Sequence, residues 1–102
     1  MFELHTAYGH YNNCTWNIEG SGKHTCYEII NDEGSIMTVN VPGYGKSDTI
    51  VAIKNYSENE GIMDFLKIHG LIKKIHGYVP SGFVKMPLVE LDIEKLKSMN
   101  EE

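Results

Sequence analysis

The chain has 102 residues and a mass of 11.5 kDa, with 41% hydrophobic and 23% charged residues, proportions typical of one soluble globular domain. Nine lysines against fourteen acidic residues give a net charge of −5, which argues against a protein that binds nucleic-acid phosphates directly. There is no arginine, so no guanidinium group can bind phosphate or guanine through two hydrogen bonds. No apolar run is long enough to span a membrane, and the first residues lack signal-peptide features, so we expect a cytoplasmic protein with no membrane contact.

The first half of the chain reads as strands and turns. Apolar and polar residues alternate from Phe2 to Tyr8, as in a half-buried strand, and again in several later segments. Gly34 closes an Asn-Asp-Glu-Gly segment that is typical of a hairpin turn. The predicted strands are 2–8, 14–19, 24–30, 35–41 and 50–53. The predicted turns and loops are 9–13, 20–23, 31–34 and 42–48.

The second half begins with a predicted helix. Ser57 and Glu60 have the spacing of a capping box, and Gly70 is a natural helix stop. Asp92 is expected to cap a short last helix over 93–99, followed by a frayed tail at 100–102. The segments 71–75, 83–86 and 88–91 read as extended, and a proline after 86 predicts a sheet edge or a strand end.

These elements predict a single α+β domain over residues 1–102. We expect an antiparallel β-sheet meander with one principal helix packed on it and a short C-terminal helix. The strand order and the oligomeric state are left open, a homodimer included.

A metal site is the first chemical hypothesis. His10, Cys14, His24 and Cys26 are zinc-binding residue types, but they lack the spacing of common structural zinc sites. In a symmetric hairpin, Cys14 lies on the apolar face with Trp16, whereas Cys26 lies on the opposite face. We therefore predict no metal ligands, no cofactor and no disulfide, and we keep a zinc- or small-ligand-binding module of these four residues as the alternative function.

Two catalytic patterns are incomplete. Gly43 to Ser47 contains the Gly-Lys-Ser of a phosphate-binding loop, but Asn40 stands where the motif needs glycine, and the following segment reads as strand rather than helix. The five histidines form no triad or nucleophile elbow with neighbouring residues. We therefore expect no enzymatic activity and name no catalytic residue.

An interaction surface is the remaining hypothesis. Acidic residues around the predicted helix start could complement a basic groove on another protein. Asn59 is not needed for capping, which makes it a candidate contact, and the glycine-rich loop is expected to expose an aromatic and a lysine side chain. The predicted partner-binding residues are Glu58, Asn59, Asp64, Tyr44 and Lys46.

Residues 54–91 resemble short uncharacterised proteins from bacterial phages, plasmids and conjugative elements. The resemblance rests on Tyr-Ser-Glu-Asn-Glu-Gly at 56–61, Pro-Ser-Gly-Phe-Val at 80–84 and the closing segment Pro87 to Leu91. It implies a mobile-element protein in a bacterial host cell, a setting in which small acidic proteins often inhibit defence systems. By analogy, the expected function is inhibition of a host defence nuclease, of the anti-CRISPR or anti-restriction type, by protein–protein contact with the enzyme.

Overall fold

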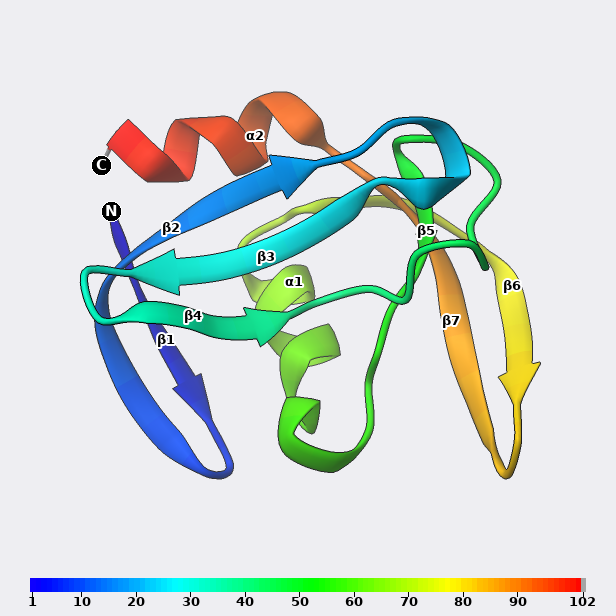
Figure 1. Ribbon diagram of the computed structural model, residues 1–102, viewed down its shortest axis with the longest axis horizontal. Helices are drawn as coiled ribbons and strands as arrows, with labels where there is room; N and C mark the ends of the chain where they lie inside the picture. Colours follow the sequence, from blue (N-terminus) through cyan, green and yellow to red (C-terminus); the bar gives the residue numbers. More distant parts are fainter. Residues whose placement is uncertain (102) are drawn as a thin grey trace.

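The computed structural model describes residues 1–101 and confirms the α+β class, with two antiparallel sheets and two short α-helices (Figure 1). The first sheet has the order β1-β2-β3-β4, and the second has the order β5-β7-β6. The elements are β1 (Phe2–Thr6), β2 (Gly9–Glu19), β3 (Cys26–Asn31), β4 (Gly34–Thr38), β5 (Ile50–Ala52), α1 (Ile62–Ile68), β6 (Ile72–Ser81), β7 (Val84–Leu91) and α2 (Ile93–Ser98).

The first sheet is a meander whose first turn is shorter than predicted. β1 and β2 are joined only by Ala7 and Tyr8, because Thr6 pairs with Gly9. The hydroxyl of Thr6 accepts a hydrogen bond from the Tyr8 amide and donates one to the Gly9 carbonyl, which satisfies the turn locally. The predicted turn at 9–13 is therefore wrong: these residues belong to β2.

The second sheet places β7 in its centre, which corrects the expectation that Pro87 marks an edge or a strand end. Proline is tolerated there because β5 ends at Ala52, opposite Leu88. The hydrogen-bonded pairing between β5 and β7 therefore ends next to Pro87, where the missing amide hydrogen of proline costs little. The Pro87 carbonyl still accepts a hydrogen bond from the Ile53 amide.

The two helix starts were predicted with different success. Asp92 caps α2 as expected, with its carboxylate accepting a bond from the Lys95 amide at 3.2 Å. The capping box before α1 is wrong: Ser57 begins a 3₁₀ turn with φ +59°, and α1 begins after Gly61 without a side-chain cap. Gly61 has φ +98°, a left-handed conformation that glycine adopts without the strain of a side chain.

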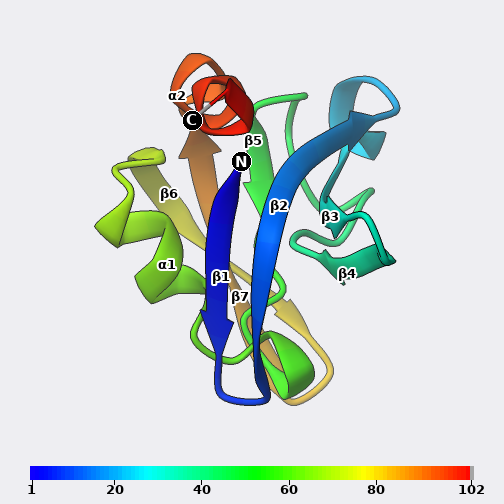
Figure 2. The ribbon, with the colours of Figure 1, turned by 90° about the vertical axis from the view of Figure 1, so that its left-hand side faces the viewer.

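The C-terminal residues are ordered rather than frayed up to residue 101. Met99 is buried, and the Asn100 side chain forms two hydrogen bonds with the backbone of Trp16 on β2, at 2.7 and 3.1 Å. The ammonium group of Met1 donates to the Asn100 carbonyl, so the two ends of the chain lie side by side (Figure 1, Figure 2). The tail predicted to fray also includes Glu102, which lies outside the described residues.

Most of the core lies between the first sheet, α1, α2 and the central strand of the second sheet. Phe2, Trp16 and Phe65 form an aromatic group there, with ring centroids 5.8–6.5 Å apart. A second, smaller cluster of Ala52, Met86 and Leu88 lies on the other side of the three-stranded sheet. In the described part of the chain, no helix has the length and apolar character needed to span a membrane.

Candidate functional site

The predicted partner-binding residues do not share one surface. Glu58 and Asp64 are exposed on either side of the start of α1. Tyr44 and Lys46 are exposed on the loop that leads to β5, which is tied to the β2–β3 connection by a bond from the Gly43 amide to the Lys23 carbonyl. Figure 1 places this loop away from α1, so Tyr44 and Lys46 lie in a different region from Glu58 and Asp64.

Asn59 is buried, which corrects its prediction as a contact residue. Its side chain is 1% exposed, and its amide nitrogen donates to the Thr38 carbonyl at 2.8 Å. This bond attaches the turn before α1 to the end of β4, 21 residues earlier in the chain. Asn59 therefore stabilises the fold, and we remove it from the candidate surface.

The Gly-Lys-Ser segment leads into a strand, as its sequence predicts. The backbone amides of Lys46 and Ser47 both lie within bonding distance of the Ile50 carbonyl, at 2.9 and 3.4 Å, so they are not left open as a phosphate cradle. The Ser47 hydroxyl accepts from the Ile50 amide. The loop is a compact connection that presents Tyr44 at its surface, 45% exposed.

The alternative metal set of His10, Cys14, His24 and Cys26 is not assembled. Cys14 is fully buried in the main core, whereas Cys26 pairs with Glu19 at the other end of β2. The sequence left open whether the two cysteines share a face, because that depends on the hairpin register. The structure places them on opposite faces, as a symmetric hairpin would, although the pairing register differs from the symmetric one. Burial raises the pKa of both thiols, and for Cys26 the nearby carboxylates of Glu28 and Glu19 raise it further, so neither favours the thiolate that binds zinc.

A groove of about 560 Å³ lies between β1 and α1. Figure 2 shows these two elements side by side. One of the predicted contact residues, Asp64, lines it, together with the carboxylates of Glu3 and Glu60. Two imidazoles, His5 and His69, and several apolar side chains complete the lining, and no lysine is part of it among the described residues. The apolar lining residues are Ala7, Phe65 and Ile68.

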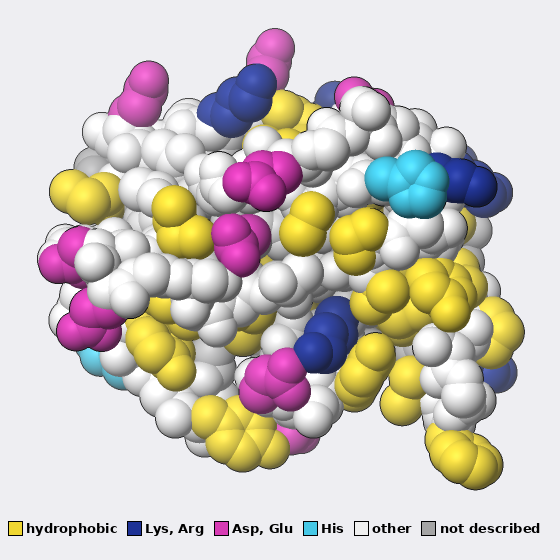
Figure 3. Space-filling view, viewed as in Figure 1, with side chains coloured by type: hydrophobic (Ala, Val, Ile, Leu, Met, Phe, Trp, Pro, Cys, Tyr) yellow, Lys and Arg dark blue, Asp and Glu magenta, His cyan; other side chains and the backbone are white. Residues whose placement is uncertain are grey.

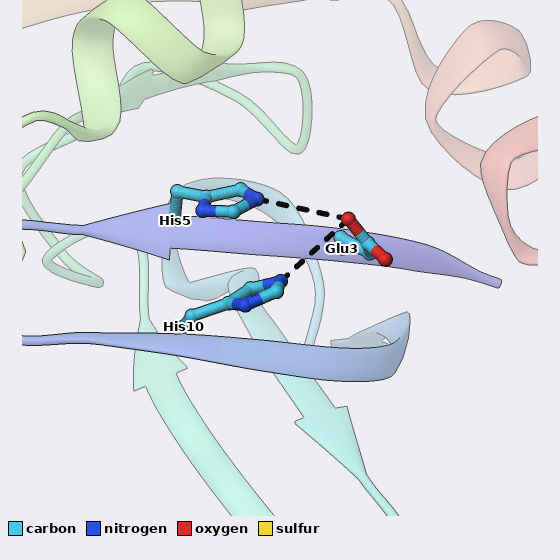
Figure 4. Close-up of side chains that lie close together, drawn as sticks. All are labelled: Glu3, His5 and His10. Carbon is cyan, nitrogen blue, oxygen red and sulfur yellow. Dashed lines mark ion pairs between the residues drawn. The ribbon is translucent and has the colours of Figure 1, made fainter.

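The edge of this groove carries a cluster that the sequence analysis missed. Glu3 and His5 lie two residues apart on β1, and His10 is the direct partner of His5 on β2 (Figure 4). The Nε2 atoms of both histidines lie 3.6 Å from the same Glu3 oxygen, Oε2, and the two rings stack with centroids 3.9 Å apart. Placing the hairpin turn at residues 7–8 would have revealed this pairing, because it sets His5 opposite His10.

The strongest electrostatic effect at the predicted surface belongs to Glu58. Its carboxylate accepts a hydrogen bond from the Lys54 ammonium at 2.5 Å. That bond, together with hydrogen bonds to its own backbone and to Ser57, lowers the pKa of Glu58 to about 2. Since the side chain is 61% exposed and already paired with Lys54, Glu58 is a weaker candidate for a partner's cation than the groove carboxylates.

No known protein family, curated protein or solved structure matches this chain. The function is therefore argued from the groove and the cluster themselves.

Proposed function

We propose that this chain is a protein-binding module that inhibits a nucleic-acid-processing enzyme of a bacterial defence system. The observation that carries the proposal is the groove between β1 and α1, which holds three carboxylates and no lysine among its described lining residues. A groove of this charge attracts a lysine- or arginine-bearing surface and repels nucleic-acid phosphates. Such basic surfaces line the channels in which nucleases hold their substrates.

Apolar area in the same groove supports a protein partner. Ile68, at the end of α1, is 80% exposed, and Phe65 of the same helix also lines the groove. Covering an exposed isoleucine side chain contributes roughly 1.5–3 kcal/mol when it is fully removed from water. The combination of carboxylates around an apolar centre fits a basic segment that also carries an aliphatic or aromatic side chain.

The choice of a defence enzyme rests on the resemblance of residues 54–91 to mobile-element proteins. That resemblance includes the turn before α1, which supplies Glu60 to the groove. The expected mechanism is competition: the carboxylates of the groove occupy lysine and arginine side chains that otherwise hold phosphates. Inhibition of this kind needs no reaction on the chain itself.

The test is a plasmid-transformation assay in bacterial strains that each carry one active restriction or CRISPR nuclease. Cells express the native chain, the double variant Glu60→Lys/Asp64→Lys, or the matched control Glu94→Lys/Glu101→Lys, which makes the same change in net charge on exposed residues of the C-terminal region. We expect the native chain and the control to restore transformation against at least one nuclease, and the groove variant to lose at least about tenfold of that effect.

Binding of the responsive enzyme is then measured by calorimetry with both purified proteins at increasing salt. Electrostatic recognition predicts weaker binding as the salt concentration rises. The proposal fails if no nuclease is inhibited by the native chain. It also fails if the groove variant protects as well as the native chain while melting at the same temperature.

A further inference from the structure

The three side chains at the β1–β2 hairpin have the residue types of a transition-metal site. Two imidazoles and one carboxylate form a donor set that suits divalent ions such as Zn²⁺, Cu²⁺ and Ni²⁺. All three donor atoms lie within 4.8 Å of one another. This cluster shares only His10 with the four residues that the sequence suggested.

The backbone places these donors without help from a ligand. Residues two apart on a strand share a face, which brings Glu3 and His5 together, and direct pairing across the hairpin adds His10. The short turn is held by the two hydrogen bonds of the Thr6 hydroxyl. On the opposite face of β1, Phe2 and Leu4 are buried in the core, so the strand that carries two of the donors is anchored.

The distances are close to those of a metal centre. With metal–nitrogen and metal–oxygen bonds of about 2.0–2.2 Å, neighbouring ligand atoms of a tetrahedral site lie about 3.4 Å apart. The two nitrogen–oxygen distances are both 3.6 Å, close to this value, but the two rings stack at an interplanar angle of 14°, so they must turn about their side-chain bonds before both Nε2 lone pairs point at one ion. Figure 4 shows both rings directed toward the Glu3 carboxylate from neighbouring strands.

Nothing in the described part of the chain competes for these donors. Among the residues that the structure describes, the Glu3 carboxylate forms ion pairs with His5 and His10 and none with a lysine. The side chains of Glu3, His5 and His10 are 63%, 68% and 47% exposed, so an ion can reach them and keep water at its remaining position. Among residues 1–101 the structure records no side-chain hydrogen bond to the second nitrogen of either ring, so we expect a moderate affinity.

We propose that Glu3, His5 and His10 form a binding site for one divalent transition-metal ion, with Zn²⁺ as the test ion. His5 and His10 bind through Nε2 and Glu3 through a carboxylate oxygen. This site shares Glu3 and His5 with the groove lining but goes beyond the proposed inhibition, because Glu60 and Asp64, which test the groove, are not among its ligands.

Isothermal titration calorimetry of the full chain with Zn²⁺ tests the site. We expect one ion per chain and a dissociation constant in the micromolar range. His5→Ala, His10→Ala and Glu3→Gln should each weaken binding by about tenfold or more. The control variants His24→Ala and Cys26→Ser remove potential zinc ligands that lie outside the cluster and should leave binding unchanged.

Nitrogen-detected NMR of the histidine rings gives the second measurement. Zn²⁺ should shift the Nε2 signals of His5 and His10 and leave those of His24 and His76 in place. The proposal is overturned if the native chain binds no Zn²⁺ at about 1 mM, the weak limit of useful affinity. It is equally overturned if the variants of all three proposed ligands fold and bind as tightly as the native chain.

Discussion

The two sheets of the molecule are built from similar hairpins but are supported very differently. The four-stranded sheet packs one face on the main core and is tied to the C-terminal residues by Asn100. The three-stranded sheet contributes Val51 of β5 and Val89 and Leu91 of β7 to that core, and the second cluster, on its other face, has three buried residues. The turn between β6 and β7 projects into solvent, visible as the hydrophobic group protruding at the lower right of Figure 3.

From this difference we expect a hairpin's contribution to stability to depend on what its faces pack against more than on its turn. Both hairpins have two-residue turns with regular pairing next to the turn and register shifts farther along the strands. Phe83 in the β6–β7 turn is fully exposed, whereas Leu4 on β1 is completely buried. Substitutions at buried strand positions should therefore cost far more stability than substitutions in the exposed β6–β7 turn.

The largest effect is expected at the buried face of β1. Leu4→Ala removes a fully buried side chain and leaves a cavity between β1 and the rest of the main core. We expect a loss of about 2–5 kcal/mol in the free energy of unfolding. Urea denaturation followed by tryptophan fluorescence measures this loss, since Trp16 lies in the same cluster. A loss below about 1 kcal/mol would mean that the first sheet is not the better supported one.

A pH titration should reveal a second large effect, at Tyr27 on β3. Burial, with a smaller contribution from Asp48, raises the pKa of the Tyr27 hydroxyl to about 12, and that hydroxyl donates to the Asp48 carbonyl. Because the unfolded chain loses this proton near the ordinary value of about 10, the stabilisation is complete below pH 10 and is lost as pH rises toward 12.

Urea denaturation at several alkaline pH values measures that loss. The variant Tyr27→Phe lacks the ionisable hydroxyl and should show a smaller decline over the same pH range, although it is destabilised at neutral pH by loss of the hydrogen bond. Equal slopes for Tyr27→Phe and the native chain would contradict the assignment to this tyrosine.

The buried amide of Asn59 should have an intermediate effect. Asn59→Ala leaves the Thr38 carbonyl without its hydrogen bond in the region where α1 joins the first sheet. We expect a loss of about 1–3 kcal/mol. Asn55→Ala, a half-buried asparagine before the same turn, is the matched control and should cost less. If the two variants are equally stable, the bond from Asn59 does not support the junction.

The smallest effect is expected at the tip of the second sheet. Phe83→Ser removes an aromatic ring that is fully exposed in the β6–β7 turn. Stability should change by no more than about 0.5 kcal/mol, as at other exposed sites. Thermal unfolding by circular dichroism measures the change. A fall of several degrees in the melting temperature would show that the Phe83 ring packs on the sheet and contributes to its stability.

The candidate site was only partly readable from the sequence. The acidic character of the α1 region was predicted, and Asp64 does line the groove. The contribution of Glu3 and His5 was missed, because the predicted turn at 9–13 left His10 outside any strand. Asn59 was predicted as a contact residue because helix capping does not require it. Its side chain instead binds the carbonyl of Thr38, which is distant in the sequence.

Sequence by itself determined the features that depend on near neighbours. Alternation predicted Cys14 on the core face, and Asp92 and Gly70 marked helix ends through bonds within a few residues. These features follow from backbone geometry, which is the same wherever the segment lies.

Only the tertiary structure decided which segments meet. The docking of Asn100 on Trp16 joins residues 84 positions apart, and the central place of Pro87 depends on where β5 ends. The pairing of His5 with His10 depends on a shift in the position of one turn. Such contacts are selected by the packing of the whole core, so a local pattern indicates which residues can pair but does not determine which partner each one finds.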